Sequence, residues 1–168
     1  CYTLGAVPPL GSMDAVVCMG ASVGMAIGFD KADSEAHKHS VAVIGDSTFI
    51  HSGITGLIDA VYNKSHITVV ILDNRTTGMT GHQNHPATGK TIKNEPTYEL
   101  DLEQVCRAVG VPNVRTIDPN DLSAMEAALK EGLAKEEVSV IIAKRPCVLL
   151  TKKLYNGFRV NDKCKKCK

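Results

Sequence analysis

Two polar residues follow two apolar segments at a spacing that could build a metal site. Asp46 follows the apolar run 41–44, and Asn74, 28 residues later, follows the apolar run 67–72. Short runs rich in Val and Ile are typical of buried parallel strands. The carboxyl ends of such strands meet at one edge of an open α/β sheet, where ligands bind. Two side-chain oxygens there, completed by phosphate oxygens, predict an octahedral Mg²⁺ site.

The rest of the chain supplies the elements that would hold this site. Between the two strands, apolar residues recur at helical spacing and predict a helix over 53–62: Ile54, Leu57, Ile58 and Val61. Two more helices are expected, at 102–109 and 121–134. Two more strands are expected, at 114–117 and 138–143. Strands that alternate with helices predict an α/β fold with a doubly wound parallel sheet and right-handed crossovers.

Three segments carry less regular patterns. Residues 1–13 are expected to form a loop, because Pro8-Pro9 excludes helix. Residues 14–29 contain many small side chains that allow a close approach to a ligand, and they lead into a helix. Residues 75–98 form a long polar loop rich in Gly and Pro, and so long a loop is usually functional.

Longer motifs around these positions resemble one family. Segments 45–53 and 72–83, supported by 1–5 and 18–25, are similar to the diphosphate domain of the indolepyruvate:ferredoxin oxidoreductase α subunit. That family belongs to the 2-oxoacid:ferredoxin oxidoreductases. The general thiamine-diphosphate motif has Gly-Asp-Gly and, about 30 residues later, Asn-Asn. This chain has Ser47 in place of the second Gly and Asp73 in place of the first Asn, and both departures match the indolepyruvate subfamily. The resemblance spans roughly residues 1–160 and implies the thiamine-diphosphate-binding fold.

The resemblance also implies a set of binding residues. Thiamine diphosphate would be held with Mg²⁺, whose ligands are the side-chain oxygens of Asp46 and Asn74 and the backbone carbonyl of Thr76. Asp73 would orient the loop or help to neutralise local charge. The expected cofactor contacts are Gly20, Ala21, Ser22, Gly45, Asp46, Ser47, Thr48, Asn74, Thr76, Gly78 and Met79. Two alternatives stay open: Asp46 as a helix cap, and residues 20–22 as a place of tight helix packing.

Three histidines fall near the expected mouth of the site: His51, His82 and His85. A histidine there could move protons or bind a substrate carboxylate, although a loop histidine is more often exposed or hydrogen-bonded. His51 is favoured, because it stands next to the diphosphate loop.

The cysteines divide into two groups. Cys18, Cys106 and Cys147 have no partner at ligand spacing and are expected in the core. Cys164 and Cys167 form a Cys-x-x-Cys pair, which alone could be a redox pair, half of a zinc site or half of a cluster site. The pair resembles the start of a bacterial ferredoxin motif. They would ligate a 4Fe-4S cluster only in a longer parent protein, and a plain linker is the alternative. The expected domains are therefore residues 1–150 for thiamine diphosphate and Mg²⁺, and residues 151–168 for a linker and the truncated start of a ferredoxin-like iron–sulfur domain.

Composition limits the partners and the cellular location that we expect for the protein. A net charge of +1 over 168 residues gives no reason to expect nucleic acid or an anionic membrane as partner. No apolar run approaches the roughly 20 residues that span a bilayer. The scattered cysteines of an enzyme-like chain favour reduced thiols and a cytoplasmic location.

The resemblance implies oxidative decarboxylation of arylpyruvates such as indolepyruvate to aryl-acetyl-CoA, with ferredoxin as electron acceptor. Expected partners are a pyrimidine-binding domain of the same subunit, a β subunit, ferredoxin, coenzyme A and the 2-oxoacid. No catalytic residue is expected in this fragment, because the activating glutamate of such enzymes lies on the pyrimidine-binding domain, and the fragment alone is expected to be inactive. The alternatives are another thiamine-dependent 2-oxoacid oxidoreductase or decarboxylase, and a non-catalytic phosphate-binding module.

Overall fold

Four parallel strands form one sheet in the computed structural model, which describes residues 2–151 and 160–165. The strand order is β1-β2-β4-β3, so β4 lies between the two strands that precede it in sequence. The strands are β1 Val41–Gly45, β2 Thr68–Asp73, β3 Asn113–Ile117 and β4 Ser139–Lys144.

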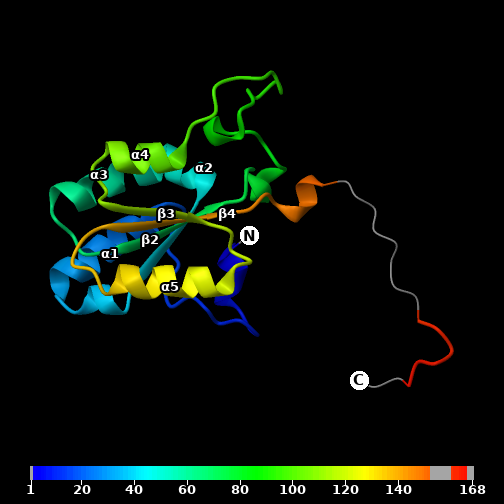
Figure 1. The fold of residues 1–168 in the computed structure, drawn as a ribbon, viewed down its shortest axis with the longest axis horizontal. Helices are drawn as coiled ribbons and strands as arrows, with labels where there is room; N and C mark the ends of the chain where they lie inside the picture. The colour runs from blue at the N-terminus through cyan, green and yellow to red at the C-terminus, as the bar shows by residue number, and fades with distance from the viewer. Residues whose placement is uncertain (1, 152–159, 166–168) are drawn as a thin grey trace.

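Helices cover both faces of this sheet. Figure 1 shows α3 and α4 on one side of it and α5 on the other. The helices are α1 Ala21–Ala32, α2 Asp46–Thr48, α3 Ile54–Tyr62, α4 Leu102–Ala108 and α5 Leu122–Leu133, with short 3-10 helices at Tyr2–Ala6, Ala36–Lys38, Gly78–Thr80, Pro86–Thr88 and Val148–Leu150.

The alternation of side chains along the strands divides the core in two. One cluster joins α1, α3 and α4 to one face of the sheet, and its fully buried members include Ile44, Phe49 and Ile71. A smaller cluster packs α5 against the other face through Val70, Ile141 and their neighbours. Adjacent residues of β2 therefore belong to different clusters, which explains why this strand is apolar without interruption.

The chain passes from β1 into helix without a loop. Gly45 ends the strand in an extended conformation, and Asp46 is the first residue of α2. Residues Phe49–Gly53 form a π-helical turn that joins α2 to α3. A Cβ on Gly53 would lie 2.7 Å from Cδ1 of Ile44 and 2.9 Å from Cδ2 of Phe49, so only glycine fits this turn as it is packed.

The doubly wound parallel α/β sheet is confirmed, and several local expectations need correction. The helix predicted over 53–62 is α3, but helical backbone begins earlier than expected, at Asp46, because α2 and the π-helical turn follow Gly45 directly. Ile58, expected among the buried apolar residues of this helix, is 47% exposed, because α3 faces the core with Leu57 and Ala60 instead. Residues Tyr2–Ala6 form a 3-10 helix within the segment expected as a loop. Among the described residues, none of the helices is long and apolar enough to cross a membrane.

Candidate functional site

Asp46 is the buried centre of the carboxyl edge of the sheet. Its side chain is only 4% exposed, and both of its oxygens accept backbone hydrogen bonds. Oδ1 accepts the N–H of Ser47 at 2.7 Å, and Oδ2 accepts the N–H of Arg75 at 2.9 Å. The second bond ties the start of α2 to the turn after β2, so the two motifs that are 28 residues apart in sequence meet here.

His85 completes the surroundings of this carboxylate. Its Nε2 lies 3.1 Å from Oδ2 of Asp46, and its side chain is equally buried. Its Nδ1 lies 3.3 Å from the backbone N of Ala87 and accepts that N–H. The proton of the neutral ring therefore belongs on Nε2, which donates to Asp46. His85 thus orients the carboxylate of Asp46 through Nε2.

The turn after β2 presents the predicted oxygen ligands. Arg75 has a left-handed backbone with φ 62°, and its N–H is shared between Asp46 and Oδ1 of Asp73 at 3.2 Å. Oδ1 of Asn74 accepts the N–H of Thr76 at 3.1 Å, which fixes the orientation of the amide and leaves a second lone pair on its oxygen. The expected role of Asp73 in orienting this loop fits its bond to Arg75.

The electrostatic balance of the site is negative. Asp46 and Asp73 are both nearly inaccessible to solvent, and the nearby guanidinium of Arg75 also pairs with Glu99 at 2.6 Å. Burial raises the pKa of Asp73, the charge of Arg75 opposes that rise, and Asp46 adds to it. Two buried carboxylates so close together favour a bound cation, because a cation relieves the cost of keeping both ionised.

We expect Asp73→Asn to stabilise the cation-free protein at neutral pH. A carboxyl with a raised pKa binds its proton more tightly when folded, so stability from this group is greatest at low pH. That stability is lost as the pH rises from the ordinary value of 3.8 through the raised value of the folded state. Asparagine carries no such penalty, and each kcal/mol corresponds to roughly 2–4 °C in a domain of this size.

Thermal unfolding at several pH values tests this expectation. The melting temperature of Asp73→Asn should exceed that of the wild type at pH 7, and the gap should close towards pH 3. A gap that is constant across this range would show that the ionised carboxylate carries no penalty in the fold.

A second helix start faces the same edge. Gly20 has a left-handed backbone with φ 90° and precedes α1, and no side chain of the described residues caps this helix end. A Cβ on Gly20 would lie 2.5 Å from Oγ of Ser52 and 3.6 Å from Cγ2 of Thr48. The structure therefore brings the predicted segments 20–22 and 45–48 together, so that two helix N-termini with their partial positive charge lie close to each other.

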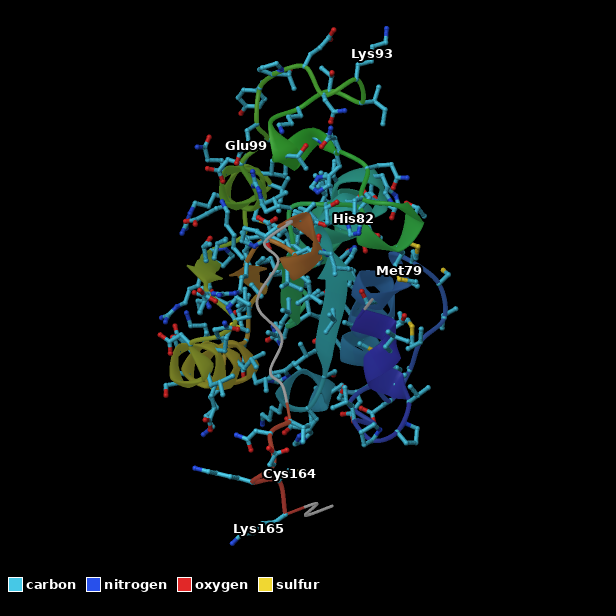
Figure 2. All side chains as sticks on the ribbon, turned by 90° about the vertical axis from the view of Figure 1, so that its right-hand side faces the viewer. Met79, His82, Lys93, Glu99, Cys164 and Lys165 are labelled. Atoms are coloured by element: carbon cyan, nitrogen blue, oxygen red, sulfur yellow. The ribbon has the colours of Figure 1, made fainter. Side chains whose placement is uncertain are left out.

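The long loop between β2 and α4 folds back on itself above this edge. Backbone bonds join Thr77 to Gln83, and Thr97 to Gly89. Figure 2 shows Met79 and His82 on the near part of the loop and Lys93 at its far tip. Gly78 and Met79 begin a 3-10 turn, and the Met79 side chain is 65% exposed. Its exposure leaves Met79 free to contact a ligand or another domain.

The residues present fit a diphosphate with Mg²⁺. The hydroxyls of Ser22 and Thr76 are buried without a hydrogen-bond partner among the described residues, although buried polar atoms are normally paired. Both belong to the predicted contact set. Carboxylate, amide and carbonyl oxygens are the donors that Mg²⁺ prefers. The donor chemistry therefore suits Mg²⁺, and the hydroxyls of Ser22 and Thr76 are available to bond a diphosphate.

The structure revises the ranking of the histidines. His51, the favoured candidate, is exposed on the π-helical turn, and His82 is also exposed. His85 alone among the three contacts Asp46. No local sequence pattern predicts this contact, because 39 residues separate His85 from Asp46 and the contact depends on how the long loop folds.

The cysteines follow their expectation only in part. Cys106 is fully buried, and desolvation raises its pKa to about 12, as expected of a core thiol. Cys18 is exposed and Cys147 half-buried, so their placement in the core was wrong; both lie in irregular segments outside the packed helices. Cys164 is exposed, and its N–H donates to the carbonyl of Asn161. Cys167 lies outside the described residues.

Comparison with known proteins agrees with this geometry. Residues 3–143 match the family model "Thiamine pyrophosphate enzyme, C-terminal TPP binding domain". Indolepyruvate oxidoreductase subunit IorA of Archaeoglobus fulgidus is 45% identical over 150 residues, which cover 89% of this chain and 24% of that protein. The subunit of the same name from Pyrococcus abyssi is 38% identical, with 100% of this chain and 29% of that protein covered. The chain thus spans about a quarter of the length of these relatives.

Solved structures show the same fold at low identity. The 2-oxoglutarate:ferredoxin oxidoreductase of Magnetococcus marinus superposes with a TM-score of 0.66 at 17% identity, over 76% of this chain and 45% of that one. A thiamine diphosphate-dependent 4-hydroxybenzoylformate decarboxylase from Rhodococcus jostii reaches 0.53 at 21% identity, over 76% of this chain and 23% of that one. The chain therefore belongs to the thiamine pyrophosphate enzymes through their C-terminal TPP binding domain, and its resemblance to the indolepyruvate oxidoreductase subunit is confirmed.

Proposed function

We propose that this chain holds the diphosphate of thiamine diphosphate and a Mg²⁺ ion for an enzyme that oxidatively decarboxylates arylpyruvates such as indolepyruvate. The observation that carries the proposal is the buried Asp46, tied to the turn after β2 through the N–H of Arg75. The names of the relatives support the substrate class, since they are indolepyruvate oxidoreductase subunits.

Each part of the site has a physical task in this proposal. Asp46, the side chain of Asn74 and the carbonyl of Thr76 would ligate Mg²⁺. The N-terminal ends of two helices, at 20–22 and 45–48, would hydrogen-bond the diphosphate oxygens through N–H groups and hydroxyls. When bound, thiamine diphosphate supplies the carbon nucleophile and the electron sink for decarboxylation of a 2-oxoacid. Gly78 and Met79 would line the space beside it.

His85 acts on the metal ligand rather than on the substrate. By donating from Nε2 to Asp46, it fixes the carboxylate in one orientation. Ligand carboxylates are commonly held by such outer hydrogen bonds, whose loss lowers metal affinity. His85 is therefore a positioning residue in this proposal.

The remaining components of the reaction belong to other parts of the proposed enzyme. A pyrimidine-binding domain of the same subunit would activate the cofactor, and a β subunit, coenzyme A and ferredoxin would complete the reaction. Electron transfer would use 4Fe-4S clusters, one of them ligated by Cys164 and Cys167 of the longer protein. Residues 1–150 form the cofactor domain and residues 151–168 the connection to the cluster domain. The cysteine usage of the sequence supports a cytoplasmic setting.

Binding measurements test the proposal against a general phosphate-binding module. Thiamine diphosphate should bind the assembled enzyme only with Mg²⁺ present, and ATP at equal concentration should not displace it. Asn74→Ala should weaken this binding by roughly tenfold, because a neutral oxygen ligand is lost and the charged one remains. Indolepyruvate should be oxidised faster than pyruvate or 2-oxoglutarate. Binding that needs no divalent cation, or that ATP displaces, would contradict the proposal.

A further inference from the structure

A second cluster of metal-ligating side chains lies at the opposite edge of the sheet. Asp30, His37 and His66 each offer one ligand atom, and these atoms all lie within 4.8 Å of one another. The three residues come from the last turn of α1, the 3-10 helix Ala36–Lys38 and the segment just before β2. Because His66 precedes β2 and Asn74 follows it, roughly 20 Å or more of strand separates this cluster from the proposed Mg²⁺ site.

The orientation of each residue suits a bound cation. Nδ1 of His37 lies 2.8 Å from the carbonyl of Ser34, so donation there leaves the lone pair on Nε2. Histidine ligands typically make this outer hydrogen bond to a carbonyl, which fixes the tautomer. The rings of His37 and His66 meet edge to face, with centroids 5.5 Å apart.

Asp30 supplies the negative charge of the cluster. Oδ2 of its carboxylate pairs with Lys31 at 3.1 Å, which leaves Oδ1 facing Nδ1 of His66 at 3.9 Å. The carboxylate is 6% exposed and the side chain of His66 is 35% exposed. Two imidazoles and one carboxylate oxygen are therefore gathered in a site that is mostly buried but open to solvent on one side. The last carbonyls of α1 add partial negative charge there.

We propose that Asp30, His37 and His66 bind one divalent transition-metal ion, with Zn²⁺ as the ion of best fit. Nε2 of His37, Nδ1 of His66 and Oδ1 of Asp30 are its protein ligands, and water takes the fourth position of a tetrahedral site. Nitrogen ligands distinguish this site from the all-oxygen Mg²⁺ site at the other edge. The ion would join the end of α1 to the starts of β1 and β2, and so stabilise the fold.

Metal titration tests the site. The titration uses the protein with Cys164→Ser and Cys167→Ser, called the parent below, so that the thiols of the tail cannot compete for metal. The buffer holds excess Mg²⁺ and thiamine diphosphate to occupy the proposed Mg²⁺ site at the opposite edge of the sheet. One equivalent of Zn²⁺ should bind and raise the melting temperature. Co²⁺ in its place should give visible d–d absorption without a thiolate charge-transfer band.

Variants separate a metal site from a packing cluster. His37→Gln and His66→Gln should each weaken Zn²⁺ binding by about tenfold or more, since even the loss of an outer hydrogen bond costs roughly 10–100-fold. His39→Gln, which changes an exposed histidine beside the cluster, should bind Zn²⁺ as tightly as the parent. The proposal is overturned if the parent takes up no stoichiometric Zn²⁺. It is equally overturned if the double variant H37Q/H66Q binds the ion as tightly as the parent does.

Discussion

Replacing Asp46 with alanine is expected to abolish Mg²⁺-dependent binding of thiamine diphosphate. Asp46 is the one charged ligand of the proposed metal set, and its side chain is 4% exposed. Removal of one partner from a buried charge pair costs about 3–5 kcal/mol, which corresponds to roughly 100-fold or more in affinity. Calorimetric titration of the assembled enzyme with thiamine diphosphate at saturating Mg²⁺ measures this loss.

Two further variants isolate the role of the charge. Asp46→Asn retains one oxygen that can accept the N–H of Ser47 or Arg75, so it should fold with some loss of stability and still lose most of its Mg²⁺-dependent affinity. Asp59→Ala removes an exposed carboxylate from α3 and should leave affinity unchanged. If Asp46→Ala, shown to be folded by circular dichroism, binds the cofactor normally, Asp46 is a structural cap and not a metal ligand.

Phe49→Ala is expected to cause the largest loss of stability. Phe49 is fully buried where the π-helical turn meets β1, and it packs beside Ile44 and Gly53. Truncation of a core phenylalanine costs about 3–5 kcal/mol, because transfer energy is lost and a cavity remains. Urea unfolding followed by circular dichroism gives this value directly.

Phe49→Ala should also weaken binding at the proposed metal site. Phe49 stands three residues after Asp46 in a continuous helical segment, so relaxation around the cavity would shift the carboxylate. We expect weaker cofactor binding even under conditions where the variant remains folded. Ile58→Ala, on an exposed position of α3, is the matched control and should change both quantities little. A Phe49→Ala protein as stable as this control would show that the turn is loosely packed.

The sequence was informative where local pattern decides structure. The apolar runs of β1 and β2 and the polar residues that end them predicted both the parallel sheet and the meeting of Asp46 with the segment around Asn74. Register supports this meeting, since Gly45 pairs with Leu72 and the two strands end together.

Contacts made across long sequence separations could not be predicted in the same way. His85 reaches Asp46 only because the loop of residues 75–98 folds back, and no local pattern marks that fold. Asp30, His37 and His66 come from three separate elements, none of which has a metal-ligand spacing of its own. Cys18 was misplaced because residue type alone suggested burial, whereas its irregular segment lies on the surface.

The direct passage from β1 into α2 restricts how the length of this chain can vary. Asp46 follows the last strand residue with no linker, and α2, the π-helical turn and α3 continue without interruption to Tyr62. One inserted residue in the strand would send every later side chain to the opposite face, and one inserted in the helix would rotate them by about 100°. The loop of residues 75–98 carries no such restriction at its exposed far end. Insertions and deletions among homologous chains should therefore be absent at 41–53 and gather near Lys93.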